Sequence, residues 1–449
     1  MKQKSEQEYT SFFHLWNQPL EKHRSLKKNS SFELKRQPSL LSLVNAIGKL
    51  QSISTHDDIL QNVKHKGKEG SRLHISENGQ DVLVMEIASK RLQVVAGTLE
   101  KLFIKLADES AQDFDYIDTY ILCHLFFTDS LELLENLMAR FHLEALPDDM
   151  YYFDRVLNVI LRWIKLQFQD FKSNPVLMAR LEAFLHGDVS RSGYKAEASM
   201  VKKALDEQKL VSYDTDLKLK KNTRLTFYNN LTDILYMNSK DAAKRLTLVD
   251  YYILKCITAQ DYLAMFFSKT ENKTDNIALM TERANKLSKW VLEQVTLHEL
   301  HSKQRRATLR KIMEIAKLCL SWNNFHTCMV ITMGLTQLEE FNIVTFKNLF
   351  KYLNVCNNMS YYRHAFRKAA KSPCIPFFPI VLKDLTFFIE GNATKKPDGL
   401  INFLKFRVLS QLIHDILSYT MEDYHFVSSL DQVFESLLNK KVHSTSLCD

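Results

Sequence analysis

The sequence predicts an all-α fold made of two helical domains, of which the C-terminal domain carries a protruding helical hairpin. The chain of 449 residues holds only 10 glycines and 8 prolines, fewer than strand-and-turn architectures need. Apolar residues recur at helical spacing over long segments from about residue 80 onward. The chain is also too long for one ordinary core, so we expect more than one domain.

Changes in composition along the chain divide it into four parts. We expect a polar N-terminal extension over residues 1–75, because bases and serines are frequent there and apolar periodicity is weak. A first helical domain covers 76–190 and a lysine-rich linker covers 191–229. A second helical domain covers 230–449, and no repeat of fixed period suggests a solenoid.

The first domain is predicted from four helical segments. In "RLQVVAGTLEKLFIKLAD" the residues Leu92, Val95 and Leu99 lie at helical spacing, which predicts a helix that begins near residue 91. Two helices separated at Thr128 follow, and "DRVLNVILRWIKLQFQDF" adds another. Pro175 opens the last one, since proline suits the first helical turn.

The stretch "WNNFHTCMV", residues 322–330, is unusual for the interior of a helix. Asparagine side chains compete with the backbone for hydrogen bonds and so disfavour helix interiors. We therefore expect a break between two core helices, with Asn323 or Asn324 capping the second.

The stretch "PFFPIVLKDLTFFIEGN", residues 376–392, predicts the first helix of the hairpin. Pro379 suits the first turn, and Gly391 suits a left-handed cap after the last. Thr386 and Glu390 lie four residues apart and therefore side by side. An exposed turn follows, and "LINFLKFRVLSQLIHDIL" returns as the second helix. From the residues alone, an ordinary helical hairpin packed in a core is the other interpretation.

No motif for covalent catalysis or for a cofactor is present. The nearest metal motif is "HELH" at residues 298–301, but its histidines are three apart rather than four, so we interpret it as a solvated helix face. Phosphate-binding glycine loops and nucleophile elbows are absent as well. The sequence therefore directs attention to binding, and we expect no cofactor.

Charge and cysteine content limit the partners and the compartment. The net charge of +8 suits peripheral contact with an anionic membrane or an acidic partner, while no aromatic-and-arginine strip suggests nucleic acid. The start of the chain lacks an apolar signal core, and no 18-residue apolar run predicts a membrane span. Seven cysteines without a CxxC pair suit a reducing compartment. We expect a protein of the cytoplasm, or of the host cytoplasm for a bacterial effector.

Five segments in this order resemble the Ras-type guanine nucleotide exchange factors, the family of Son of sevenless. They are "AKRLTLVDYYILKCITAQDYL", "NKLSKWV", "QRRATLRKIMEIAKLCLSWNNFHTCMVITMGL", "PCIPFFPIVLKDLTFFIEGN" and "GLINFLKF". The segment from residue 91 to 141 resembles the Ras exchanger motif domain that accompanies the catalytic domain in this family. The resemblance covers roughly residues 80–190 and 230–440.

The resemblance implies that a helical hairpin opens the nucleotide site of a small GTPase of the Ras, Rap or Ral type. By motif position, Glu390 takes the place of a glutamate that occupies the α-phosphate space, and Thr386 takes the place that blocks magnesium. Son of sevenless has leucine at the position of Thr386. GTPase contacts are implied at five further positions: Phe377, Lys383, Asn392, Thr336 and Arg283.

We therefore interpret the chain as a guanine nucleotide exchange factor rather than an enzyme that makes or breaks bonds. The exchanger motif domain is expected to brace the hairpin through residues such as Leu134, Leu137 and Trp163. The alternative is a helical scaffold that binds a GTPase or another protein without exchange activity.

Overall fold

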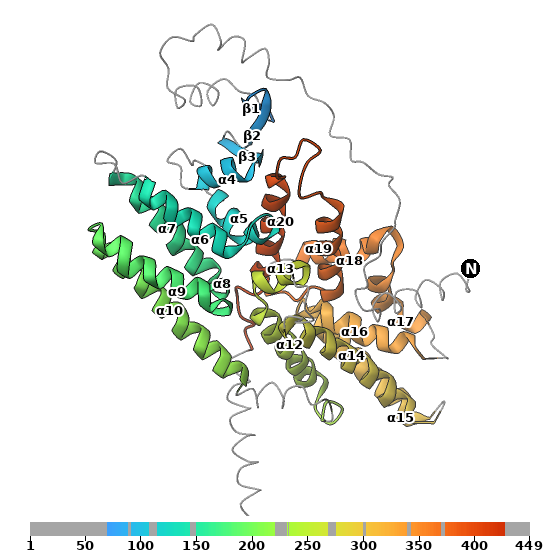
Figure 1. Ribbon diagram of the computed structural model, residues 1–449. Coiled ribbons are helices and arrows are strands. Elements are labelled where there is room, and N and C mark those ends of the chain that lie inside the picture. Colours follow the sequence, from blue (N-terminus) through green and yellow to red (C-terminus); the bar gives the residue numbers. More distant parts are fainter. Residues whose placement is uncertain are drawn as a thin grey trace, which may run out of the picture. The chain divides into compact units, whose positions relative to one another are not determined.

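The computed structural model describes residues 70–88, 91–106, 115–143, 150–220, 231, 233–267, 275–299, 302–338, 343–369 and 373–426 (Figure 1). These residues form two compact units. The first in the chain contains the described residues up to 220 together with 387–412, and the second contains those from 221 to 386 together with those from 413 onward. Each unit is described by itself below, as the N-terminal unit and the C-terminal unit.

The N-terminal unit begins with three strands and continues with helices. The strands are β1 (Arg72–Glu77), β2 (Gln80–Ala88) and β3 (Arg91–Gly97). The helices are α4 (Leu99–Leu106), α5 (Tyr116–Cys123), the 3₁₀ turn η2 (His124–Phe126), α6 (Ser130–Leu143), α7 (Met150–Leu166), α8 (Phe168–Ser173), α9 (Pro175–Phe184), the π-helical turn η3 (Leu185–Val189) and α10 (Lys195–Lys220).

The antiparallel sheet, in the order β1-β2-β3, was not predicted. The helix expected to begin near residue 91 is wrong over its first part, because Leu92 and Val95 lie in β3 and only the part from Leu99 is helical. Asn78 and Gly79, which join β1 to β2, both have positive φ, as a tight hairpin turn requires. Val84, Val95 and Ala96 are buried, so the sheet is covered and stable as part of the unit.

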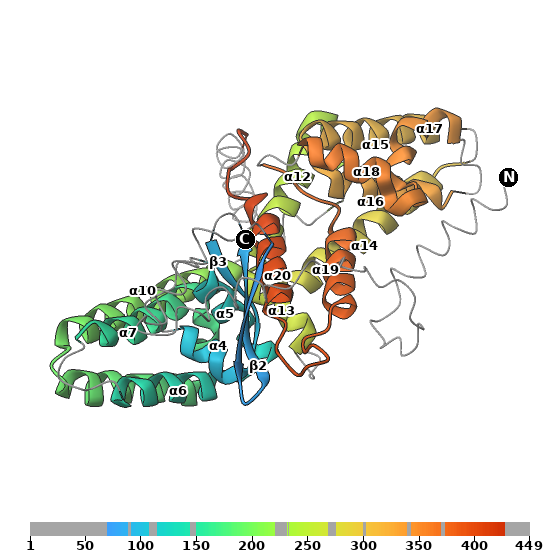
Figure 2. The same cartoon turned by 90° about the horizontal axis from the view of Figure 1, so that it is seen from above.

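The helices of this unit pack around α7, which contacts both α6 and α10 (Figure 2). As predicted, Pro175 opens α9, and the side chain of Asn174 accepts hydrogen bonds from the amides of Val176 and Leu177. The linker expected over 191–229 contains α10, whose residues Val201 and Leu205 are buried. Residues 195–220 are therefore part of the N-terminal unit.

The C-terminal unit is built from helices, and α19 and α20 each extend into the N-terminal unit. The helices are α12 (Ser239–Cys256), α13 (Ala259–Phe267), α14 (Asp275–Thr296), α15 (Lys303–Ser321), α16 (Phe325–Thr336), α17 (Ile343–Phe350), the 3₁₀ turn η4 (Lys351–Leu353), α18 (Cys356–Ala369), α19 (Phe378–Gly391) and α20 (Phe403–Ser418).

Helix α16 is the centre of this unit, since every residue from Phe325 to Leu335 is buried. A Cβ on Gly334 would lie 2.6 Å from the carbonyl oxygen of Ser288, so only glycine permits this approach of α16 to α14. Asn324 caps α16 by accepting a hydrogen bond from the amide of Thr327, as the sequence predicted. Asn323, with φ of 59°, makes the break before it.

The helical architecture is thus confirmed for the described residues, with the small sheet as an addition. The extension expected over 1–75 lies outside the described residues except for its last few positions, which enter β1. Six cysteines are described, all with free thiols, and Cys123, Cys319, Cys328 and Cys374 are buried.

Candidate functional site

The candidate site is the hairpin formed by α19, the loop over residues 392–402 and α20 (Figure 1, Figure 2). Pro379 stands in the first turn of α19, as predicted. The left-handed cap expected at Gly391 is wrong, because Gly391 is the last helical residue and does not have positive φ. The side-chain amide of Asn392 instead donates to the carbonyl oxygen of Phe388 at 2.7 Å.

Glu390 lies in the last turn of α19 and its side chain is exposed. Among the described residues it makes neither a hydrogen bond nor an ion pair through its carboxylate. A carboxylate close to a helix C-terminus faces the partial negative charge of that end, which is unfavourable. The position therefore costs stability, and it leaves the carboxylate available to an external partner.

Thr386 lies one turn before Glu390 and is half-buried. Its hydroxyl donates to the carbonyl oxygen of Leu382 at 2.9 Å. Because the hydroxyl proton is already used, Thr386 offers a methyl group and an oxygen lone pair to any partner.

Lys383 and Asp384 lie on the preceding turn of α19. Lys383 is exposed. Asp384 accepts two hydrogen bonds from the guanidinium of Arg363 on α18, at 2.6 and 2.7 Å. This bidentate pair ties the first half of α19 to α18 within the C-terminal unit.

Two of the implied GTPase contacts are not at the surface. Phe377 is fully buried and its ring packs near Tyr362, at a centroid distance of 6.3 Å. Arg283 is 2% exposed, and its Nε donates to Oδ1 of Asp250 at 2.6 Å. The surface position on this part of α14 belongs to Glu282. Both side chains therefore pack in the core of the C-terminal unit in this conformation, and their contact with a GTPase stays a prediction.

Arg283 belongs to a buried polar network that joins α12, α14 and α16. Asp250 accepts hydrogen bonds from Arg283, from the hydroxyl of Thr327 and, at 3.4 Å, from Asn324. Burial alone would raise the pKa of Asp250, but Arg283, His326 and Thr327 outweigh it and hold the pKa below its usual value. Asp250 is therefore charged and satisfied inside the protein.

His326 connects this core to the start of the hairpin. Its Nδ1 accepts from the backbone amide of Phe378 at 3.4 Å, so the imidazole carries its proton on Nε2. Burial lowers the pKa of His326 to about 4, which keeps the ring neutral near pH 7. The amide of Phe377 is bound in the same way, by the hydroxyl of Tyr362 at 2.9 Å. The base of α19 is thus fixed by two buried side chains.

The remaining implied contacts lie on different elements. Asn392 is exposed directly after α19. Thr336 is the last residue of α16, is half-buried, and donates to the carbonyl oxygen of Met333 at 2.6 Å. The structure thus places Lys383, Thr386 and Glu390 on one helix, and Thr336 on another.

The far end of the hairpin is fixed inside the N-terminal unit by main-chain contacts. Gly97, at the end of β3, and Ile401 exchange two backbone hydrogen bonds of 3.2 and 2.8 Å. Arg407 of α20 donates from Nε to the carbonyl oxygen of Val94 at 2.9 Å. The end of the loop therefore forms an isolated β-bridge with the end of β3, and Arg407 ties α20 to the same strand.

Aromatic packing adds to this anchorage. The ring of Tyr116 stacks on Phe403, and Phe126 and Phe127 both pack on Phe406, at centroid distances of 5.2 and 5.3 Å. Of the bracing residues expected from the sequence, Leu134, Leu137 and Trp163 are buried. The indole of Trp163 donates to Asp170 within the same unit. The aromatic contacts to α20 come instead from Tyr116 of α5, Phe126 of η2 and the following Phe127.

Comparison with family models decides the assignment. The RasGEF domain model matches residues 241–407, and the RasGEF N-terminal motif matches residues 93–184. The chain contains a RasGEF domain together with a RasGEF N-terminal motif. The first match ends on α20, so it contains α19, the loop and only the first five residues of α20.

Curated relatives match most of the length of this chain. The chain is 27% identical over 403 residues to Ras guanine nucleotide exchange factor J of Dictyostelium discoideum, covering 80% of this chain and 48% of that protein. It is 23% identical over 451 residues to Protein son of sevenless of Drosophila melanogaster, covering 85% of this chain and 28% of that protein. The chain thus spans half or less of the length of these two relatives.

Two residues of the RasGEF hairpin were missed by the sequence analysis. Phe387, next to Thr386, is 63% exposed although it is aromatic. Its position off the apolar face of α19 was visible from helical spacing. Lys405 on α20 is 5% exposed although it is charged. No sequence signal distinguishes it from a surface lysine, because its burial depends on the N-terminal unit.

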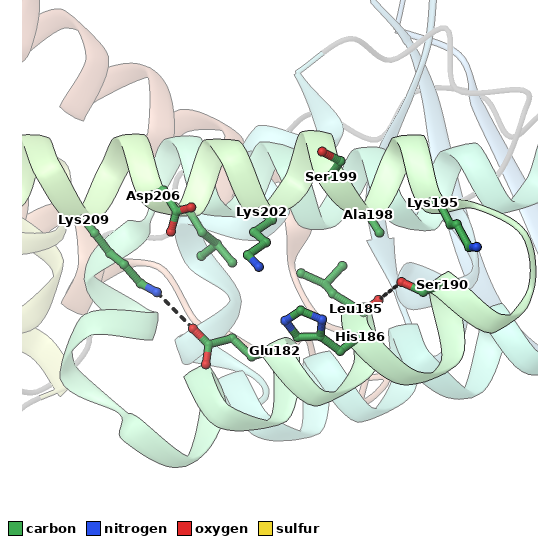
Figure 3. Close-up of a pocket in the computed structure, with 11 residues that line it drawn as sticks. Glu182, Leu185, His186, Ser190, Lys195, Ala198, Ser199, Lys202, Asp206 and Lys209 are labelled. Atoms are coloured by element: carbon green, nitrogen blue, oxygen red, sulfur yellow. Dashed lines mark hydrogen bonds and ion pairs between the residues drawn. The ribbon is translucent and has the colours of Figure 1, made fainter.

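A surface groove of about 370 Å³ lies between α9–η3 and α10 (Figure 3). Its lining combines exposed polar side chains with the buried Leu185, Ala198 and Leu205, and the Nζ of Lys209 donates to Glu182 across it at 2.9 Å. Among the described residues no cluster of His, Cys, Asp and Glu is arranged to hold a metal ion. None of the helices in the described ranges has both the length and the apolar character that a membrane span needs.

Proposed function

We propose that this chain is a guanine nucleotide exchange factor that opens the nucleotide site of a Ras-family small GTPase with the α19–α20 hairpin. The observation that carries the proposal is the exposed carboxylate of Glu390, unpaired among the described residues, in the last turn of a helix whose base is buried. The family assignment supports it.

The carboxylate of Glu390 would act by competing with phosphate. Small GTPases hold nucleotide through backbone amides, a lysine and Mg²⁺, all of which attract negative charge. A carboxylate delivered to these donors replaces the phosphate as their partner and repels it. No covalent bond is made or broken, because exchange requires only that the nucleotide-free state be stabilised relative to the bound states.

Thr386 would approach the magnesium position, one helical turn from Glu390. Its methyl group excludes less volume than the leucine of Son of sevenless, and its hydroxyl proton is occupied by Leu382. We therefore expect Thr386 to weaken metal binding by crowding rather than by supplying a ligand. Lys383 and Asn392, which are exposed, remain proposed contacts of the GTPase surface, and so does Thr336.

Fixed geometry supports insertion of the hairpin. The base of α19 is held by His326 and Tyr362, and the loop is held by Gly97 through its pair with Ile401. A side chain that competes for a site must be held close to its productive position, because misplacement of about 1 Å is costly. The N-terminal unit would thus act as a brace for the loop and the start of α20.

A binding scaffold without exchange activity is the second candidate. It is favoured by two observations, the burial of Phe377 and Arg283 and the smaller side chain at Thr386. Such a protein would bind the GTPase and leave the bound nucleotide in place.

Release of a fluorescent nucleotide from a panel of Ras, Rap and Ral proteins separates the two candidates. Exchange activity predicts release that is faster with the protein than without it, for at least one member of the panel. A protein that binds a panel member in a pull-down but does not accelerate release from any of them is a scaffold.

The place of action is part of the proposal. We propose that the protein acts in the cytoplasm and meets its GTPase at an anionic membrane face, which the net charge of +8 supports. Co-sedimentation with vesicles of neutral and of anionic lipid tests the membrane contact, which should weaken as salt rises.

A further inference from the structure

Lys405 of α20 is a buried lysine inside the hairpin. Its side chain is 5% exposed, and its Nζ donates to the carbonyl oxygen of Ile389 at 3.0 Å and to Oγ1 of Thr394 at 3.2 Å. The ammonium also lies over the rings of Phe126 and Phe406, at 5.5 and 6.0 Å. Among the described residues it has no carboxylate partner.

Burial of such a lysine destabilises the folded protein. Removing an ammonium from water without a counter-charge is unfavourable, and burial correspondingly lowers the pKa of Lys405. A methionine of similar length would fill the space between the aromatic rings without this cost. The presence of a lysine at this buried position points to a task for its charge at the end of α19.

That end of α19 combines two negative features. The last carbonyl groups of a helix carry partial negative charge, and Glu390 adds a full negative charge in the same turn. The contact of Lys405 with Ile389, the residue directly before Glu390, places positive charge under this turn. The ammonium offsets the local charge without pairing with Glu390, whose carboxylate stays exposed.

The contacts of Lys405 also fix the position of the hairpin tip, residues 388–394. The ammonium of Lys405 binds the last turn of α19 through Ile389 and the loop through Thr394. Because Lys405 lies on α20, it joins these two segments to the second hairpin helix. Phe126 of η2 lies against the same ammonium, so the N-terminal unit contributes to the position.

We propose that Lys405 is the positioning residue of Glu390: by binding the carbonyl oxygen of Ile389 it fixes the last turn of α19 and holds the carboxylate ready for the GTPase. This inference rests on the proposed exchange function. Lys405 acts through Glu390, so its removal should matter only while Glu390 is present.

A double-mutant cycle in stimulated nucleotide release tests this dependence. The four proteins are the parent, Lys405→Met, Glu390→Ala and the double variant. We expect Lys405→Met to lower kcat about 10-fold, the size of one charge-assisted hydrogen bond, with KM changed less than about 2-fold. In the Glu390→Ala background the same substitution should change kcat less than about 2-fold. An equal loss in both backgrounds would overturn the proposal and leave Lys405 a purely structural residue.

Two further measurements keep the test independent of general damage. Lys395→Met removes a positive charge from an exposed position in the same loop and should leave kcat at the parental value. Hydrogen–deuterium exchange should rise in Lys405→Met at residues 388–394 and remain unchanged in α14 and α16. If the tip is unchanged while kcat falls, positioning is the wrong explanation. If Lys405→Met does not fold, Lys405→Gln, which keeps a donor without the charge, replaces it in the same cycle.

The outcomes distinguish this inference from the proposed function. A parent protein that accelerates release from no GTPase removes the exchange function, and the hydrogen–deuterium exchange comparison then decides alone whether Lys405 fixes the tip. An active parent with an unaffected Lys405→Met variant removes only the inference about Lys405.

Discussion

Tyr116 of α5 and Phe403 of α20 stack with their ring centroids 4.6 Å apart and their planes inclined by 29°. The hydroxyl of Tyr116 also donates to the carbonyl oxygen of Leu102 at 2.6 Å. One residue of the N-terminal segment thus joins α4, α5 and the second hairpin helix inside a single unit. The contact makes the brace testable by one substitution.

Tyr116→Ala should lower stability and exchange activity together. Loss of a buried aromatic ring costs about 3–5 kcal/mol, and the cavity lies directly beside α20. Thermal unfolding followed by circular dichroism and stimulated nucleotide release would be measured on the same preparation. Tyr116→Phe, which keeps the stacking and loses one hydrogen bond of about 1 kcal/mol, is the matched control. A folded Tyr116→Ala protein with parental activity would refute the bracing role.

The ends of helices were predictable from the sequence where residues close in the chain determine them. Asn324 caps α16 and Pro379 opens α19 as the sequence indicates, because caps and first turns depend on a few neighbouring residues. The sheet was missed although Asn78-Gly79 is a strong hairpin signal. The positions of Val94 and Val95 are compatible with both helical and strand periodicity. The pairing of β3 with β2 determines that they form a strand.

The placement of the candidate site residues was predictable only where helical spacing determines it. Glu390 and Thr386 fall on one helix at the expected spacing, since four residues make one turn. Phe377 and Arg283 could not be assigned to the core from the sequence, because Tyr362, His326 and Asp250 that bury them come from distant segments. Burial of this kind is a tertiary property.

His326 should make stability depend on pH. Its pKa is about 4 in the folded protein, whereas an exposed histidine titrates near 6.5. Between these values the unfolded chain binds a proton that the folded protein does not, so stability falls as pH falls from about 6.5 to about 4. Asp250 favours protonation of the ring and Arg283 opposes it, but burial dominates. The expected loss from this residue is about 3 kcal/mol.

Urea unfolding of the parent and of His326→Gln at pH 7.0, 5.5 and 4.5 would measure most of that loss, because the first pH lies above the interval and the other two lie within it. Glutamine keeps an acceptor for the amide of Phe378 and does not titrate. The variant should lose less stability than the parent between the highest and the lowest pH. Equal losses would show that His326 is not the group that titrates.

Phe387 is expected to contact the GTPase. It is 63% exposed and lies between Thr386 and Glu390 along α19. Burial of an aromatic side chain against a partner contributes about 1.5–3 kcal/mol, so Phe387→Ala should raise KM about 10- to 150-fold with little change in kcat or in melting temperature. Val176→Ala on α9, at a position of 64% exposure, is the matched control and should leave both constants unchanged. An unchanged KM for Phe387→Ala would exclude this contact.

The central claim is that the carboxylate of Glu390 displaces nucleotide. Glu390→Ala removes the carboxylate and retains a helix-forming residue, so folding should be preserved. Loss of one charge-assisted interaction of about 1.5–3 kcal/mol corresponds to release that is roughly 10- to 150-fold slower. Thr386→Leu, which restores the bulkier family residue one turn away, should hold or increase the parental rate.

Stimulated release of a fluorescent nucleotide from a responsive Ras-family GTPase, with circular dichroism as the control for folding, is the most direct measurement. The account predicts a folded Glu390→Ala protein whose release rate is at least about 10-fold below that of the parent. A folded Glu390→Ala protein that releases nucleotide at the parental rate would contradict it.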